Sequence, residues 1–194
     1  YKAANRRDAN RFDKSLRQLF AAYRETLIED RRVLFDRYEL VDAAVRVVGV
    51  GSVGTRCYIA LFMADGESPL FLQVKEARAS VLENYLARSE FANHGQRVVT
   101  GQRLSQSSSD IFLGWAESKP SGFDFYVRQL RDMKGSFDFE SFEPDDLNEY
   151  AESCGYAIAR AMSKAGDPAL IHGYVGKSKE FDRAMENFAV AYAE

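Results

Sequence analysis

The residues with the clearest potential for chemistry form a glycine-rich segment, Gly49-Val-Gly-Ser-Val-Gly54, and a lysine further along the chain, Lys75. Glycine has no Cβ, so the backbone N–H groups of such a segment can approach a phosphate closely. A lysine on a neighbouring strand would add a full positive charge. We therefore expect the nucleotide-binding residues to be Gly49, Gly51, Ser52, Gly54 and Lys75.

Two architectures use this glycine spacing. In a dinucleotide-binding βαβ unit the glycines lead into a helix that faces the pyrophosphate, and an acidic residue follows about 20 positions on, which is near Glu76 here. In a kinase-like lobe the glycines form a turn between two antiparallel strands. The segment after Gly54, residues 55–63, is rich in strand-forming residues, and Asp65-Gly66 is typical of a hairpin. The kinase-like arrangement is favoured; a dinucleotide-binding protein and a plain structural turn remain alternatives.

The kinase-like arrangement also predicts a partner for the lysine. There, a carboxylate from the helical segment after the third strand pairs with the lysine and holds it toward the phosphates. Glu83 is the first candidate for this role and Glu90 is the alternative. Taken alone, Lys75 would be a solvent-exposed lysine at the end of a strand. The combination of glycine turn, hairpin, lysine and helical segment favours the nucleotide-binding interpretation.

The elements that must position these residues follow from hydrophobic periodicity and turn signals. They predict an α+β fold in which a five-stranded antiparallel sheet with one helix is followed by further helices. The expected domains are a helical segment at 1–36, the nucleotide-binding lobe at 37–135 and a second helical segment at 136–194. The predicted elements are a helix at about 8–30, strands within 38–48 and at 55–63 and 70–74, helical segments at 80–86 and 92–106, strands at 110–115 and 123–130, a helix from Pro144 to Ala165 and a last helix from about 178.

Composition gives no indication of a nucleic-acid partner, a metal site or a membrane span. The formal net charge is −3, which gives no argument for nucleic acid or a membrane surface. Cys57 and Cys154 are far apart in sequence and belong to no Cys/His cluster, so we expect neither a metal site nor a disulfide framework. No apolar run approaches the ~20 residues that span a bilayer, and the polar N-terminal stretch has no signal-peptide core. These features predict a cytoplasmic protein.

Five blocks of the sequence are longer and more specific than a general glycine-rich pattern. They are Val48-Gly-Val-Gly-Ser-Val-Gly-Thr-Arg56, Leu70-Phe-Leu-Gln-Val-Lys-Glu-Ala77, Asn93-His-Gly-Gln-Arg-Val-Val99, Asp110-Ile-Phe-Leu-Gly-Trp115 and Phe125-Tyr-Val-Arg-Gln-Leu-Arg-Asp-Met-Lys134. These blocks resemble a bacterial family named domain of unknown function 2252, and the resemblance covers most of the chain from about residue 40 onward. The family is similar to a permuted relative of aminoglycoside-phosphotransferase-like kinases, which implies a kinase-like N-lobe followed by part of a C-lobe.

The resemblance also implies what is missing here. Family members carry a Gly-Asp-x-His-x-x-Asn-like segment and an Asp-Phe-Asp-like segment before the glycines. Neither is present in this chain, and the nearest segments, Asp132-Met-Lys134 and Ala165-Gly-Asp167, lack the His and Asn. We therefore expect no catalytic residue and no metal ligand within this chain, which resembles the C-terminal part of a longer protein. The resemblance also implies a histidine where Met162 stands. If that histidine serves chemistry, this member is altered or inactive; the alternative is that the position packs against the core, where Met substitutes easily.

The expected function is ATP-dependent, Mg²⁺-dependent phosphotransfer by the full-length protein to an unknown small-molecule or protein acceptor. The isolated chain would be inactive. A second hypothesis, motivated by Met162, is a non-catalytic nucleotide-sensing or scaffolding protein. We expect structural roles for His94 and His172, a core position for Trp115, and solvated or salt-bridged side chains for Arg128 and Arg131.

Overall fold

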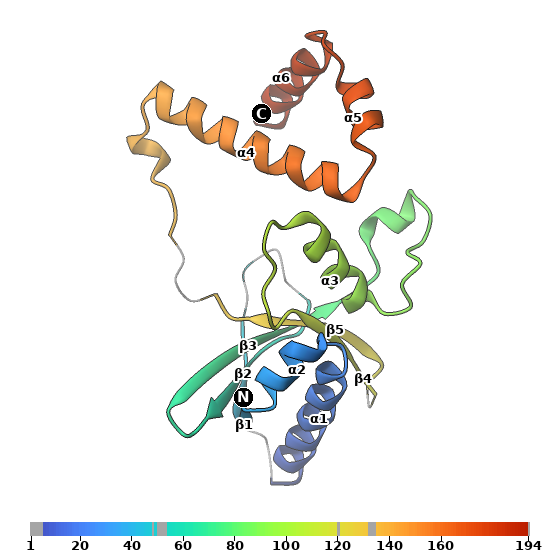
Figure 1. Ribbon diagram of the computed structural model, residues 1–194, viewed down its shortest axis with the longest axis vertical. Coiled ribbons are helices and arrows are strands. Elements are labelled where there is room, and N and C mark those ends of the chain that lie inside the picture. The colour runs from blue at the N-terminus through green and yellow to red at the C-terminus, as the bar shows by residue number, and fades with distance from the viewer. Residues whose placement is uncertain (1–5, 48, 50–53, 120, 132–134, 194) are drawn as a thin grey trace. The chain divides into compact units, whose positions relative to one another are not determined.

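The computed structural model describes residues 6–47, 49, 54–119, 121–131 and 135–193 (Figure 1). Contacts divide the chain into two compact units. The first, which we call the sheet unit, comprises residues 1–103 and 108–136. The second, the helical unit, comprises residues 104–107 and 137–194.

The sheet unit contains a five-stranded antiparallel sheet with strand order β1-β2-β3-β5-β4. Its order and the helices of the chain confirm the predicted α+β fold. The prediction that the glycine segment joins two antiparallel strands is also confirmed, because it connects β1 to β2. The elements of this unit are α1 (Arg6–Arg24), α2 (Glu29–Phe35), β1 (Glu39–Val45), β2 (Cys57–Ala64), β3 (Ser68–Ala77), the 3-10 helix η2 (Val81–Asn84), all but the last two residues of α3 (His94–Ser105), β4 (Gly114–Ser118) and β5 (Phe123–Gln129).

The hairpin between β2 and β3 forms where Asp65-Gly66 predicted it. The last residue of β2, Ala64, pairs with the first residue of β3, Ser68. Asp65 and Gly66 both have positive φ, at 52° and 72°. Two consecutive positive φ angles match the twist of an antiparallel pair, and Asp and Gly tolerate them better than other residues. This turn therefore fixes the register of β2 on β3.

One face of the sheet packs against α1 and α2 and forms the core of the unit. Phe20 meets Phe62 of β2 edge to face with ring centroids 4.8 Å apart, and Tyr23 meets Phe35 of α2 at 5.2 Å. Each large apolar side chain buried in this way contributes about 1.5–3 kcal/mol. The N-terminal helix predicted from hydrophobic periodicity therefore supplies much of the core, whose buried members are Leu16, Leu19, Phe20, Tyr23, Leu27, Phe35, Ala60, Phe62, Leu70, Leu72, Val74, Phe112, Ala116, Phe125 and Val127.

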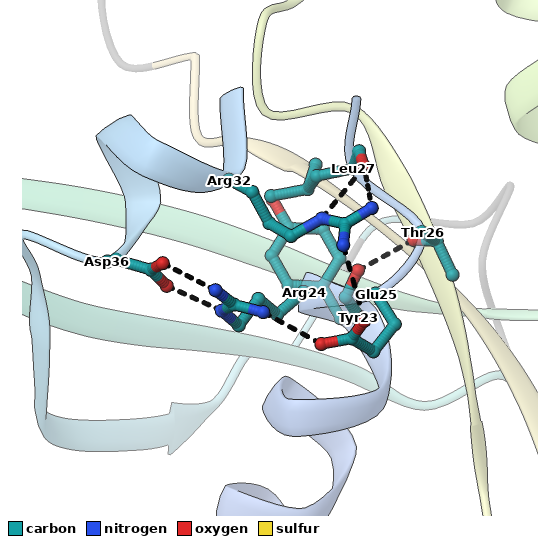
Figure 2. A network of polar contacts seen from close by, with 7 residues as sticks. All are labelled: Tyr23, Arg24, Glu25, Thr26, Leu27, Arg32 and Asp36. Atoms are coloured by element: carbon teal, nitrogen blue, oxygen red, sulfur yellow. Dashed lines mark hydrogen bonds and ion pairs between the residues drawn. The ribbon is translucent and has the colours of Figure 1, made fainter. Parts of the chain in front are cut away.

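Polar contacts fix the corner between α1 and α2 (Figure 2). Arg24 at the end of α1 binds both carboxylate oxygens of Asp36 at 2.5 Å, just beyond α2. The Thr26 hydroxyl donates to the Tyr23 carbonyl at 2.7 Å and accepts from the backbone N–H of Trp115 in β4 at 3.0 Å. The helix expected at 8–30 thus ends at Arg24, because residues 25–28 form a turn that is bonded to α2 and β4, and α2 was not predicted.

The other face of the sheet is in contact with α3. Asp124 of β5 accepts hydrogen bonds from the Asn93 side chain at 2.6 Å and from the His94 backbone N–H at 2.8 Å, so its carboxylate caps the start of this helix. A Cβ added at Gly95 would lie 2.2 Å from the Phe125 carbonyl oxygen. The helix can therefore approach β5 this closely only because residue 95 is glycine.

Two further predicted elements differ in the structure. The strand expected at 110–115 begins only at Gly114, because the Asp110 carboxylate binds the backbone N–H groups of Phe112 at 2.9 Å and Gln129 at 2.5 Å and holds 110–113 in a turn. The helix expected at 80–86 is a 3-10 helix of four residues. The first strand lies within the expected range, ends at Val45, and leaves Val47 95% exposed outside the sheet.

The helical unit contains η3 (Phe139–Ser141), α4 (Pro144–Ala165), α5 (Pro168–Val175) and α6 (Glu180–Ala193). α4 begins with Pro144 in its first turn and ends before Gly166, as predicted. α5 was not predicted; the Asp167 carboxylate accepts from the N–H groups of Ala169 and Leu170 and starts it directly after the break. Among the described residues, none in α4, α5 or α6 is buried, and no helix is long and apolar enough to cross a membrane.

Replacing Gly95 by Ala should lower the free energy of unfolding of the sheet unit by about 1–3 kcal/mol, because the new methyl group would force α3 away from the β5 backbone. Urea unfolding followed by the fluorescence of the single tryptophan, Trp115, would measure this. Gly101→Ala is the matched control in the same helix, where an added Cβ meets no atom within 4 Å. That control should be neutral or stabilising by up to about 1 kcal/mol; equal behaviour of both variants would contradict the close-approach explanation.

Candidate functional site

The glycine-rich segment connects β1 to β2 at one end of the sheet. Gly49 is exposed, and Gly54 has φ = 76° in the turn before β2. A side chain at residue 54 would be strained in that left-handed conformation, so glycine is required there for a backbone reason. Gly51 and Ser52, the other two predicted nucleotide-binding residues of this segment, lie outside the described residues.

Lys75 lies near the end of β3, directly opposite Cys57, the first residue of β2. It therefore sits at the end of the sheet where the glycine-rich segment enters β2. Successive strand residues point to opposite faces, so Lys75 lies on the opposite face from Val74 and the α1–α2 core. Its ammonium nitrogen is 5.9 Å from the centroid of the Tyr126 ring on the neighbouring strand β5, within cation–π range.

The carboxylate predicted to pair with Lys75 is engaged elsewhere. Glu83 accepts a hydrogen bond from the Ser80 backbone N–H at 3.3 Å, as part of a capping box that starts η2. Glu90, the alternative, is exposed. Over the described ranges the Lys75 ammonium forms no ion pair with either carboxylate. The Glu83 side chain therefore caps the start of its own 3-10 helix and does not pair with Lys75.

Glu76, which follows Lys75 in the sequence, carries a buried carboxylate. From sequence it is a candidate only in the dinucleotide-binding alternative. The side chain of Glu76 is only 2% exposed. Its Oε2 accepts from the Arg56 backbone N–H at 3.0 Å and from Arg56 Nη1 at 2.9 Å, and its Oε1 accepts from Arg78 Nε at 2.7 Å. We call Arg56, Glu76 and Arg78 the Glu76 clamp.

The Glu76 clamp also reaches the glycine-rich segment. Arg78 Nη2 donates to the carbonyl oxygen of Gly54. Arg56, two residues later, stacks its guanidinium 3.8 Å from the centroid of the Phe123 ring. The clamp therefore joins the end of the glycine-rich segment to the end of β3. Sequence position gives a partial signal for the clamp: Arg56 directly precedes β2, and Glu76 and Arg78 stand at the end of β3, the strand that pairs with β2.

The pKa of Glu76 reflects two opposing causes. Burial raises the pKa of its carboxyl group, but the hydrogen bonds from Arg78 and Arg56 outweigh this, so the pKa lies below its ordinary value. Glu76 is therefore ionised at neutral pH despite its burial. In the dinucleotide-binding alternative an acidic residue near this place would hold a ribose. Here both carboxylate oxygens are taken by arginines, and the residues after Gly54 form strand β2 where that alternative needs a helix.

A second polar row crosses the same face as Lys75. Gln73 of β3 is 5% exposed, and its Oε1 accepts from Arg128 Nε and Nη2 at 3.3 and 3.2 Å. The Gln73 amide nitrogen lies 3.5 Å from the Cys57 sulfur. Sequence reasoning left Arg128 as a solvated or salt-bridged side chain, whereas it binds a buried amide on the neighbouring strand. This row places polar groups beside Lys75 on the face away from the core.

The remaining residues discussed in the sequence analysis lie outside the Glu76 clamp. Trp115 is only partly buried, with the guanidinium of Arg103 6.0 Å from its ring centroid, so its expected core position is wrong. His94 is the first residue of α3, and its Nδ1 is buried without a hydrogen-bond partner among the described residues. His172 is exposed in α5, Arg131 is exposed after β5, and Met162 is 50% exposed on α4.

A hollow of about 300 Å³ is present elsewhere in the sheet unit, lined by α1, α2 and the start of β1, with Arg17, Arg24 and Asp36 at its wall. It lies beside the helices of the opposite sheet face and contains none of the predicted site residues. Among the described residues, no group of three or more His, Cys, Asp or Glu side chains is placed to hold a metal ion. The candidate site is therefore the end of the sheet that bears the glycine-rich segment, Lys75 and the Glu76 clamp.

Glu76→Gln should reduce the free energy of unfolding at pH 7 by about 1.5–3 kcal/mol, because the variant loses the charge-assisted hydrogen bonds of a buried carboxylate. The folded-state pKa is lowered, so the wild-type advantage is fully present above the unfolded pKa of about 4.3 and is lost as the pH falls through the folded value. Urea unfolding of both proteins between pH 3 and 7 would measure this. Glu67→Gln, exposed in the hairpin, is the control and should show no comparable difference. A Glu76→Gln deficit that did not shrink in acid would contradict the ionised clamp.

Comparison with known proteins gives one result. The family described as "Uncharacterized protein conserved in bacteria (DUF2252)" matches residues 3–194. No curated protein and no solved structure matches the chain. The match extends over the glycine-rich segment, all five strands and the helical unit. The chain therefore belongs to the bacterial DUF2252 family of uncharacterised proteins.

Proposed function

We propose that the sheet unit binds the nucleotide of an ATP-dependent, kinase-like phosphotransferase that acts on an unknown acceptor. One observation carries this proposal: the glycine-rich segment joins two antiparallel strands, and its end is held beside the strand that bears Lys75. Backbone N–H groups and a lysine then lie at the same end of one sheet. That is the combination that binds the phosphates of ATP in kinase-like lobes.

Charge explains why both parts are needed. A triphosphate that enters a cleft loses water, so its oxygens require fixed positive partners. The backbone N–H groups of the glycine-rich segment supply partial charges and Lys75 supplies a full one. The Tyr126 ring lies within cation–π range of the ammonium group and does not neutralise its charge. Lys75 is therefore suited to bind an anion, because no carboxylate in the described part of the chain competes for it.

Mg²⁺ and a catalytic base belong to the proposal as contributions from outside this chain. The described residues offer no set of acidic side chains that would hold the metal. When bound, Mg²⁺ would neutralise phosphate charge and orient the γ-phosphate. The residues of this chain would bind and orient the nucleotide, and transfer would take place in the full-length protein.

A second candidate function is nucleotide sensing without catalysis. Active kinase-like lobes hold the lysine with a helix carboxylate, and here Glu83 is bonded to Ser80 instead. Met162 stands on α4 at the position where the family resemblance implies a histidine. Both features support a protein that binds nucleotide and does not transfer phosphate. Measured ATP turnover by the full-length protein would separate the two candidates, since only the first requires it.

Lys75→Ala should weaken ATP binding to the full-length protein by roughly ten- to a hundred-fold, because one charge-assisted contact to phosphate is lost. Calorimetric titration with ATP in the presence and absence of Mg²⁺, and with NAD for comparison, would measure the effect. Lys119→Ala, exposed in the turn between β4 and β5, is the control and should bind like the wild type. Equal ATP affinity and turnover for wild type and Lys75→Ala would show that the glycine-rich segment is a structural turn.

A further inference from the structure

Arg78 makes three contacts that connect three separate parts of the sheet unit. Its Nε donates to Glu76 Oε1 at 2.7 Å at the end of β3. Its Nη2 donates to the Gly54 carbonyl at the end of the glycine-rich segment. Its own backbone carbonyl accepts from Arg97 Nη2 of α3 at 2.8 Å. One residue thus links the strand, the glycine-rich segment and the helix.

The position of this side chain is determined by the buried carboxylate. Arg78 is 55% exposed, and an exposed arginine alone would be held weakly, because surface ion pairs contribute only about 0–1 kcal/mol. Glu76 is almost fully buried and ionised, so it needs both arginines to satisfy its charge. Arg56 occupies Oε2 and Arg78 occupies Oε1. The Glu76 carboxylate therefore holds the guanidinium of Arg78 in a position from which its Nη2 donates to the Gly54 carbonyl.

The bond to Gly54 acts on the peptide backbone. Gly54 has φ = 76°, a conformation that glycine adopts readily. Glycine also has more backbone freedom than any other residue, so this conformation needs contacts from outside to fix it. Fixing its carbonyl oxygen fixes the plane of the peptide group between residues 54 and 55. The Glu76 side chain holds the next backbone position as well, by accepting the Arg56 N–H. The end of the glycine-rich segment is thus fixed at two successive points.

We propose that Arg78 is a positioning residue that holds the end of the glycine-rich segment at a set distance from Lys75 and couples it to α3, so that the backbone is prepared for a nucleoside triphosphate. This inference rests on the proposed function. Arg78 acts through the backbone of residues 54–56 and needs no contact with the nucleotide. The β- and γ-phosphates would depend on this arrangement, whereas the nucleoside would not.

Two measurements on the full-length protein test the proposal, with Arg78→Met, Arg78→Lys and the exposed control Arg88→Met. The first is amide hydrogen exchange over residues 54–57 without ligand. Arg78→Met should exchange faster there than wild type, and Arg88→Met should not. The second is titration with ATP and with adenosine. Arg78→Met should weaken ATP binding roughly tenfold and leave adenosine binding unchanged.

Arg78→Lys distinguishes an effect of the guanidinium geometry from an effect of the positive charge. Lysine keeps the positive charge but lacks the planar fork that reaches two acceptors in fixed directions. We expect it to behave like Arg78→Met in both measurements. Full recovery of ATP binding by lysine would overturn the proposal in favour of a simple charge effect. Equal loss of ATP and adenosine binding in Arg78→Met would overturn it in favour of general structural damage.

The exchange measurement keeps the proposal distinct from the proposed function. If wild type bound neither ATP nor adenosine, the proposed function would fail. Faster exchange at 54–57 in Arg78→Met would then still support the positioning of the segment by Arg78. Unchanged exchange in that variant would overturn the inference whatever the wild type binds.

Discussion

The carboxylate of Glu76 has lost nearly all contact with water and stays ionised, and the candidate site is built around this constraint. A buried charge is tolerated only when its oxygens are fully bonded. Arg56 and Arg78 meet that requirement from the two chain segments that flank β2 and β3. Their positions then fix the end of the glycine-rich segment. The local order of the site thus follows from the need to satisfy one charge.

Side chains alternate between the two faces along β3, so Lys75 and Glu76 lie in different environments. Lys75 and Glu76 are neighbours in sequence, so their side chains lie on opposite faces of the sheet. Glu76 is on the face of Val74 and the α1–α2 core, where its buried charge depends on the bonds from Arg56 and Arg78. Lys75 is on the face with Tyr126 and Trp115, where no carboxylate of the described chain pairs with it. A buried structural charge and an available binding charge can therefore stand side by side without pairing with each other.

Close packing of α3 on β5 gives this second face its order. Gly95 lets the helix backbone approach Phe125, and Asp124 caps the helix from the same strand. Arg97 then reaches the Arg78 carbonyl from α3. A helix carboxylate facing Lys75 would have coupled helix and lysine directly. In this chain α3 is instead linked to the backbone of residue 78, and Glu83 bonds Ser80, so the predicted pair between Glu83 and Lys75 is not formed.

The sequence by itself determined the elements whose signals are local. The period of β2 and β3, the Asp65-Gly66 hairpin and the start and end of α4 depend on neighbouring residues, and each formed as predicted. Tertiary structure decided the rest. Asp110 became a turn residue because Gln129, far along the chain, donates to its carboxylate, and α1 ended at Arg24 because the next turn is bonded to β4. Glu76 became the centre of the site only when Arg56 and Arg78 met across the strand pair. The energy of a buried charge depends on which groups surround it, and that information is absent from local spacing.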